Sequence, residues 1–273
     1  MKLKNLIYQL QKLAPTKFAA DWDNPGLQLG ARNKEVKKIM IVVDVTDEVV
    51  DVAIKNNVDL IISHHPLIFS AIKQITMDNF IQRRVLRLLQ NDICLYVMHT
   101  NFDVTHMARI AGGKDYLNLD NMETLSTIGQ VFSSTYGKYK DLAIGYGVVG
   151  YTKYDNETLI GLANDVKRKF NISSVRVFGE MQDYVHKIAI CPGAGTGHIK
   201  DCLDYECDVL ITGDVSHHVG IDAVAQGLTI IDAGHYGIEK IFIPFVTKYL
   251  RTISEDKEFE IFNSIAKDPY VCV

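Results

Sequence analysis

Three short apolar segments, separated by stretches with helical spacing, constrain this chain more than any other feature. The segment over residues 39–45 is continuous and rich in β-branched side chains, which is typical of a strand buried on both faces. Residues 60–63 and 93–98 are interpreted as further strands. Thr46 begins one intervening helix, and residues 80–89 form the other. This β-α-β-α-β order predicts a mainly parallel sheet covered by helices.

The second half of the chain repeats the α/β pattern. Five more strands are predicted, over residues 143–149, 175–178, 187–191, 209–212 and 228–232. Further helices are predicted over residues 3–13, 157–170 and 238–253. In the last of these, Pro244 is expected to kink the helix or to mark a break in it.

Composition excludes several broad classes of protein. Apolar residues make up 47% of the 273 residues and charged residues 23%, as in soluble globular proteins, so fibrous and disordered chains are excluded. The net charge of −4 lacks the basic excess of a dedicated nucleic-acid-binding domain. No apolar run approaches the ~20 residues of a membrane span. The N-terminal lysines do not form a secretory signal, so we expect a cytoplasmic protein.

The cysteines favour a reducing environment. They are Cys94, Cys191, Cys202, Cys207 and Cys272, and no two of them form a C-x-x-C pair. Most lie in or beside apolar segments, so we expect reduced core thiols.

The segment Ser63-His64-His65-Pro66 lies at the carboxyl end of a predicted strand, where open α/β sheets bind ligands. Pro66 favours an extended chain, in which adjacent side chains point in opposite directions. The two imidazoles therefore suit two neighbouring metal ions better than one. The alternative is a pair of surface histidines that cap a turn.

A second candidate segment, His99 to Asp103, also follows a predicted strand. If the chain stays extended, His99, Asn101 and Asp103 share one face, and a carboxylate arrives near the histidines. The alternatives are that Asp103 caps a helix beginning near His106 and that His99 is a satisfied core histidine.

The third candidate pair is His235 and Glu239, four residues apart at the start of a predicted helix. These positions share a helix face, so both side chains can reach one metal cluster. The alternative, equally common, is an exposed His and Glu pair on a helix surface without a metal. The complete set provides three imidazoles and two carboxylates, which suits two divalent ions such as zinc, iron or manganese. Its members are His64, His65, Asp103, His235 and Glu239.

Two further loops follow predicted strands. The glycine-rich residues 191–197 have backbone N–H groups that can cradle an anion. A close-packed turn is favoured, because His198 stands where both phosphate-loop motifs need glycine. In residues 212–218, His217 and His218 are either acid/base groups facing the metal cluster or residues that begin a helix.

Five motifs in this order resemble one family. They are WDNPGLQLG at 22–30, LIISHHPLIF at 60–69, HTNFD at 99–103, ITGDVSHH at 211–218 and DAGHYGIEK at 232–240. They resemble the dinuclear-metal proteins known as GTP cyclohydrolase I type 2 homologues, or YbgI-like proteins. The resemblance implies two α/β domains, one inserted into the other, in a toroidal homohexamer. It also implies that the five side chains named above bind the metal and that Glu239 bridges the ions.

The order of the candidate ligands also predicts a discontinuous metal-binding domain. They come from residues 64–103 and then from 235–239, with a long α/β segment between them. The Ser, Thr and Gly content after Ser126 and the turn at Gln226 suit domain boundaries. We therefore expect a metal-binding domain of residues 1–126 and 227–273, and an inserted domain of residues 127–226.

Two functions are compatible with these residues. The first is a metal-dependent hydrolase acting on GTP or a related nucleotide, with His217 or His218 as acid/base groups and with His99 and Asn101 orienting the ligands. The second is a metal-binding toroidal scaffold or regulatory protein without robust catalysis. Nucleic-acid binding is disfavoured by the net charge.

Overall fold

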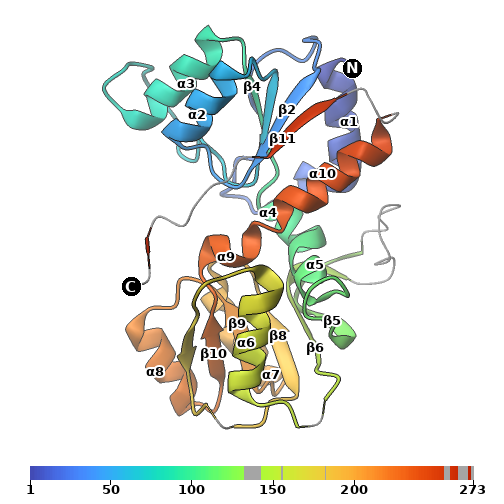
Figure 1. Ribbon diagram of the computed structural model, residues 1–273, viewed down its shortest axis with the longest axis vertical. Coiled ribbons are helices and arrows are strands. Elements are labelled where there is room, and N and C mark those ends of the chain that lie inside the picture. Colours follow the sequence, from blue (N-terminus) through green and yellow to red (C-terminus); the bar gives the residue numbers. More distant parts are fainter. Residues whose placement is uncertain (132–142, 155, 182, 255–258, 264–269, 272–273) are drawn as a thin grey trace. The chain divides into compact units, whose positions relative to one another are not determined.

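The computed structural model describes residues 1–131, 143–154, 156–181, 183–254, 259–263 and 270–271. The chain divides into two compact units (Figure 1). Unit 1 comprises Met1–Phe102 and Phe242–Lys267, and unit 2 comprises Asp103–Ile241 and Asp268–Val273. Both units are α/β, as predicted.

Unit 1 contains a five-stranded sheet in the order β1-β4-β3-β2-β11. The strands are β1 (Gly26–Leu29), β2 (Lys38–Val42), β3 (Leu60–Ser63), β4 (Cys94–Val97) and β11 (Glu260–Asn263). All pairings are parallel except that of the edge strand β1 with β4. Every residue of β3 and β4 is buried, which explains why uninterrupted apolar segments predicted these strands.

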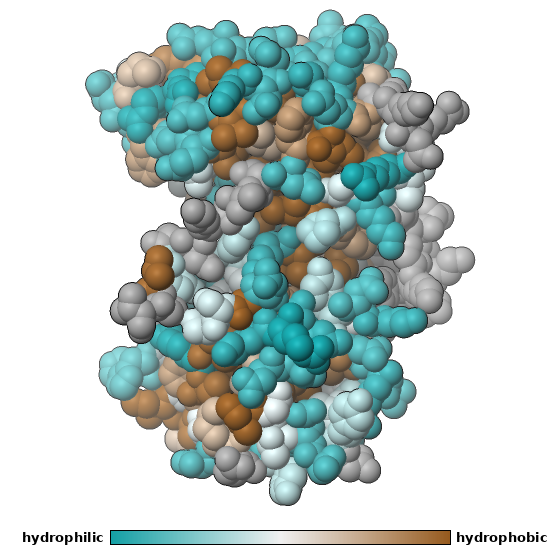
Figure 2. All heavy atoms as spheres, viewed as in Figure 1, coloured by the Kyte–Doolittle hydropathy of each residue, from teal (hydrophilic) through white to brown (hydrophobic). Residues whose placement is uncertain are grey.

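Four helices cover this sheet. They are α1 (Leu3–Leu13), α2 (Asp47–Lys55), α3 (Phe80–Gln90) and α10 (Phe242–Ile253). Figure 1 shows α2 and α3 on one side of the strands and α1 and α10 on the other. Thr46 caps α2 as predicted, because its side chain accepts a hydrogen bond from the Val49 backbone N–H. The surface over α2 and α3 is mostly hydrophilic (Figure 2).

Unit 2 contains a six-stranded mixed sheet in the order β5-β6-β8-β9-β10-β7. Its strands are β5 (Asp120–Val131), β6 (Ala143–Tyr151), β7 (Arg176–Phe178), β8 (Lys187–Ile190), β9 (Val209–Thr212) and β10 (Thr229–Asp232). Strands β8, β9 and β10 are parallel, and the other pairings are antiparallel. Its helices are α5 (Ala108–Gly112), α6 (Leu159–Phe170), α7 (Ile199–Asp204), α8 (His217–Ala225) and α9 (His235–Glu239). Figure 2 shows hydrophobic side chains on the surface over α8, where Ile221 and Val224 are exposed.

The unit boundaries differ from those predicted at residues 126 and 226. Strand β5 begins before Ser126 and pairs with β6, and β10 pairs with β9, so both strands belong to the sheet of unit 2. The stretch after Ser126, where a domain boundary was expected, is therefore a strand as far as Val131. Residues 132–139 of that segment, like Cys272, lie outside the described residues.

The helix predicted over residues 238–253 is two helices, α9 and α10, separated at Lys240 and Ile241. Pro244 lies in the first turn of α10, where its missing N–H has no partner to lose within the helix. The predicted break is therefore confirmed. None of the helices in the described part of the chain combines the length and apolar character needed to cross a bilayer.

Candidate metal ligands in the two units

In unit 1, His64 and His65 follow β3 directly. The backbone N–H groups of His64 and His65 donate to the carbonyls of Val42 and Val43 at 3.1 and 2.9 Å, which continues the parallel pairing with β2 beyond the strand. The two ring centroids are 4.9 Å apart. The expectation that extended geometry would separate the rings is wrong, because the side chains converge.

A hydrogen bond orients each of these rings. His64 is fully buried, and its Nδ1 lies 2.8 Å from the Met98 carbonyl oxygen. His65 is partly exposed, and its Nδ1 lies 2.7 Å from Oδ1 of Asp44. An Nδ1 that faces an acceptor oxygen carries the proton, so Nε2 of the neutral ring presents its lone pair.

His99 completes a group of three imidazoles in unit 1. Its ring centroid is 5.4 Å from that of His64 and 5.5 Å from that of His65. The chain does not stay extended after His99, because a short helix, α4 (Thr100–Phe102), begins at the next residue. Asn101 is buried and accepts from the His99 backbone N–H at 2.9 Å, so it fixes the backbone of this turn.

Asp23 is a functional candidate that sequence reasoning missed. Its Oδ1 lies 2.8 Å from Nδ1 of His99, and its Oδ2 accepts from the backbone and side chain of Thr100. Burial of the carboxylate opposes ionisation, but the hydrogen bonds from His99 and Thr100 outweigh it and lower the pKa of Asp23 to about 2. The only sequence signal was its place in the WDNPGLQLG motif.

In unit 2, His235 and Glu239 lie on one face of α9, as predicted. Nε2 of His235 is 3.1 Å from Oε2 of Glu239. On the other side of the ring, Nδ1 lies 2.7 Å from Oδ2 of Asp214. Glu239 is buried, with 3% of its surface exposed, so the pair is not an ordinary surface feature.

Asp103 also belongs to unit 2 and lies at the start of a π-helical turn, Asp103–Met107, that continues into α5. The alternative that Asp103 caps a helix beginning near His106 is wrong, since Asp103 is itself helical. Burial first, and then the charges of Asp103 and Glu239, raise the pKa of Cys191 to about 12. The Asp103 and Glu239 carboxylates are therefore both close enough to the Cys191 thiol to disfavour its ionisation.

The glycine-rich loop after β8 is a close-packed turn, as favoured from its sequence. Gly193 has a φ of +72°, and a Cβ atom there would lie 2.4 Å from Oε1 of Glu239. The Gly193 carbonyl accepts from the Gly213 N–H at 2.9 Å, and Gly195 donates to Oγ1 of Thr212 at 2.8 Å. The loop thus packs so closely against the Glu239 carboxylate that a side chain at position 193 would collide with it.

His217 and His218 are exposed and form the first turn of α8, with ring centroids 5.3 Å apart. The residue of this loop that contacts His235 is Asp214, which has a φ of +57°. Sequence reasoning missed Asp214 because its partner lies beyond a helix and a strand.

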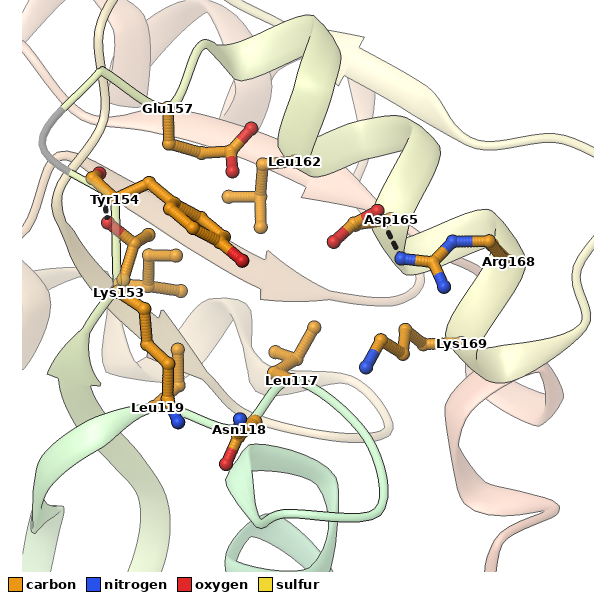
Figure 3. A pocket seen from close by; sticks show the side chains of 12 residues that line it. Leu117, Asn118, Leu119, Lys153, Tyr154, Glu157, Leu162, Asp165, Arg168 and Lys169 are labelled. Atoms are coloured by element: carbon orange, nitrogen blue, oxygen red, sulfur yellow. Dashed lines mark hydrogen bonds and ion pairs between the residues drawn. The ribbon is translucent and has the colours of Figure 1, made fainter.

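Cavities also open in the described part of unit 2. One, of about 370 Å³, adjoins the His235 pair, since its lining includes Asp214 and Gly234. Another, of about 150 Å³, is lined by α6 and the turn before β5, with Lys153, Lys169 and Tyr154 on its walls (Figure 3). None of its described lining residues is a predicted site residue.

These observations define the class of the protein. It is an α/β protein with histidines and carboxylates near the ends of its strands as candidate metal ligands. The chain belongs to the Duf34/NIF3 (NGG1p interacting factor 3) family, whose model matches residues 1–269. The resemblance inferred from the five motifs is thereby confirmed.

Relatives with similar sequences and structures cover the whole chain. A Clostridium perfringens protein named GTP cyclohydrolase 1 type 2 homolog is 33% identical over 271 residues, which is 99% of each chain. A crystal structure of a Bacillus cereus protein related to NIF3 has a TM-score of 0.87 at 26% identity and covers 100% of this chain and 99% of its own. A Staphylococcus aureus hypothetical protein has a TM-score of 0.85 at 29% identity, with the same coverage.

Proposed function

We propose that this protein is a divalent-metal-dependent hydrolase acting on GTP or a related nucleotide. His64 and His65 of unit 1 and Asp103, His235 and Glu239 of unit 2 are the proposed ligands of two ions, with Glu239 bridging them. His64, His65 and Glu239 have the donor chemistry of a metal-binding group.

The observation that carries this proposal is the shared orientation of the histidines. Nδ1 of His64, His65 and His235 each faces an oxygen atom, from Met98, Asp44 and Asp214 respectively. Metal-bound histidines almost always show this arrangement, because the hydrogen bond fixes the tautomer and raises the basicity of Nε2. Histidines with a purely structural role have no reason to share a hydrogen bond at Nδ1, so its recurrence in all three rings favours metal binding.

The His235–Glu239 contact points the same way. If Nδ1 carries the ring proton, Nε2 and Oε2 at 3.1 Å are two lone-pair donors facing each other. Such a pair is stabilised by a cation shared between the two atoms or by a second proton on the ring. A neutral imidazole and a carboxylate without thiolates suit borderline divalent ions such as zinc, iron or manganese.

Bound ions would lower the pKa of a coordinated water to ~7 and polarise the electrophilic carbon or phosphorus. The chain's own residues then hold the geometry. Asp214 keeps the proton at Nδ1 of His235, and Gly193, which has no side chain, leaves room for the Glu239 carboxylate. His217 or His218, in the first turn of α8 that follows Asp214 in the chain, is the proposed acid/base group, because both side chains are open to solvent. Asp23 orients His99 beside the unit 1 histidines.

The substrate class rests on the relatives, whose names refer to GTP cyclohydrolase. The test is metal analysis of the purified protein, followed by turnover assays with nucleotides and phosphoesters. We expect close to two ions per chain and metal-dependent turnover. In Glu239→Gln, turnover should fall while the folded state is kept. Bound metal without turnover on any substrate would instead support the scaffold or regulatory function.

A further inference from the structure

Two large aromatic side chains, Trp22 and Phe69, lie exposed in unit 1, and the first of them lies beside His99. Trp22 is 61% exposed and Phe69 is 56% exposed, and their ring centroids are 5.8 Å apart. The Trp22 ring meets the His99 ring edge-on at 6.0 Å. Single exposed apolar side chains are ordinary on protein surfaces, but two adjoining aromatic rings form a contiguous apolar patch, which is the feature that indicates a binding surface.

Hydrogen bonds hold the two segments that carry these rings. Asn24 donates to the Ile68 carbonyl at 2.7 Å, and Gln28 donates to the same carbonyl at 2.9 Å. In return, the Ile68 backbone N–H donates to Oε1 of Gln28 at 2.9 Å. Polar side chains of the WDNPGLQLG motif thus make hydrogen bonds within the protein, whereas the tryptophan side chain of the motif is exposed to solvent. The exposure of Trp22 and Phe69 is therefore built into the fold.

We propose that Trp22 and Phe69 form a stacking surface for the base of a nucleotide, placed beside His99. This inference rests on the proposed function and names the part of the substrate that unit 1 recognises. A nucleobase fits because both of its faces are flat π-surfaces that stack on aromatic rings. Two rings are too small an apolar area for a stable protein interface.

A cavity next to Phe69 extends this surface. Its volume is about 430 Å³, within the range of small-molecule sites. Its lining includes Phe69, Ser70 and Lys73. A ligand whose base stacks on the rings can place an anionic group beside Lys73, which matches the chemistry of a nucleotide.

Trp22 is the only tryptophan of the chain, so its fluorescence reports on this surface directly. Titration with guanosine or GTP should quench the emission saturably, after correction for ligand absorbance, and inorganic triphosphate should not. Phe69→Ala keeps the reporter and removes one ring. It should weaken guanosine binding by roughly 5-fold or more, because stacking on one aromatic side chain is worth about 1–3 kcal/mol. Phe69→Tyr should restore the affinity.

The matched control is Phe80→Ala, since Phe80 is 51% exposed in the same unit. It should bind guanosine as the unchanged protein does. Equal weakening by Phe80→Ala, no quenching by guanosine, or equal quenching by triphosphate would overturn the proposal. So would emission that changes on dilution alone, which would assign the surface to a second copy of the chain.

The two proposals fail separately. Saturable quenching without turnover would retain the stacking surface and remove the hydrolase. If instead the protein turns over a nucleotide and Phe69→Ala leaves the KM unchanged, the hydrolase is retained and the stacking surface is removed.

Discussion

Oδ2 of Asp214 lies 2.7 Å from Nδ1 of His235, although a helix and a strand separate the two residues in sequence. This contact makes Asp214 a positioning residue for the proposed ligand His235. Partners of this kind typically contribute 10- to 100-fold to metal affinity.

Asp214→Ala should therefore weaken metal binding by about 10- to 100-fold without unfolding the protein. The measurement is competition with a metal-sensitive chelator, with circular dichroism to monitor the fold. Asp222→Asn, which changes an exposed carboxylate on α8, is the control and should bind metal normally. Unchanged affinity in Asp214→Ala would contradict the role of Asp214.

Gly193→Ala should destabilise the folded protein, because the added methyl group collides with Glu239. The added Cβ meets Oε1 of Glu239 at 2.4 Å, and the residue must keep a φ of +72°. We expect a loss of about 1–3 kcal/mol in the free energy of unfolding, measured by urea denaturation. Gly197→Ala is the matched control, because nothing lies within 4 Å of a Cβ atom there. Equal stability of the two variants would show that the loop tolerates the methyl group.

Stability at acid pH should depend on Asp23. Its pKa is lowered from 3.8 to about 2 in the folded protein. Because the carboxyl group binds a proton more weakly in the folded protein, its ionised form stabilises the folded state, and this stabilisation is complete above the ordinary pKa of 3.8. It is lost as the pH falls from 3.8 towards the folded-state pKa of about 2. Urea midpoints of the unchanged protein should fall over this window, whereas Asp23→Asn should be less stable at pH 6 and show a smaller fall. Parallel profiles would contradict the prediction.

We expect a homohexamer in solution, a prediction that comes from the family resemblance. Light scattering should give about six times the chain mass of 30.7 kDa. A monomer at micromolar concentration would exclude the ring, and with it the scaffold function.

The apolar segments predicted eight of the eleven strands in the described part of the chain to within about three residues, whereas β1, β5 and β11 were not predicted. Strand β3 has the predicted bounds, because a strand buried on both faces needs an uninterrupted apolar run. The cap of α2 at Thr46 and the break before α10 were also predictable, since each depends on neighbours within a few residues. The motifs likewise identified the family.

Only the tertiary structure decided how the histidines are held. Asp23 contacts His99 from 76 residues away, and no local pattern relates a carboxylate to a ring at that distance in the chain. The helix beginning at Thr100 was missed for the same reason, because Asp23 binds its first N–H and hydroxyl. Local sequence sets which residues can be strands and helices. The contacts that orient the candidate ligands form only when distant segments pack together.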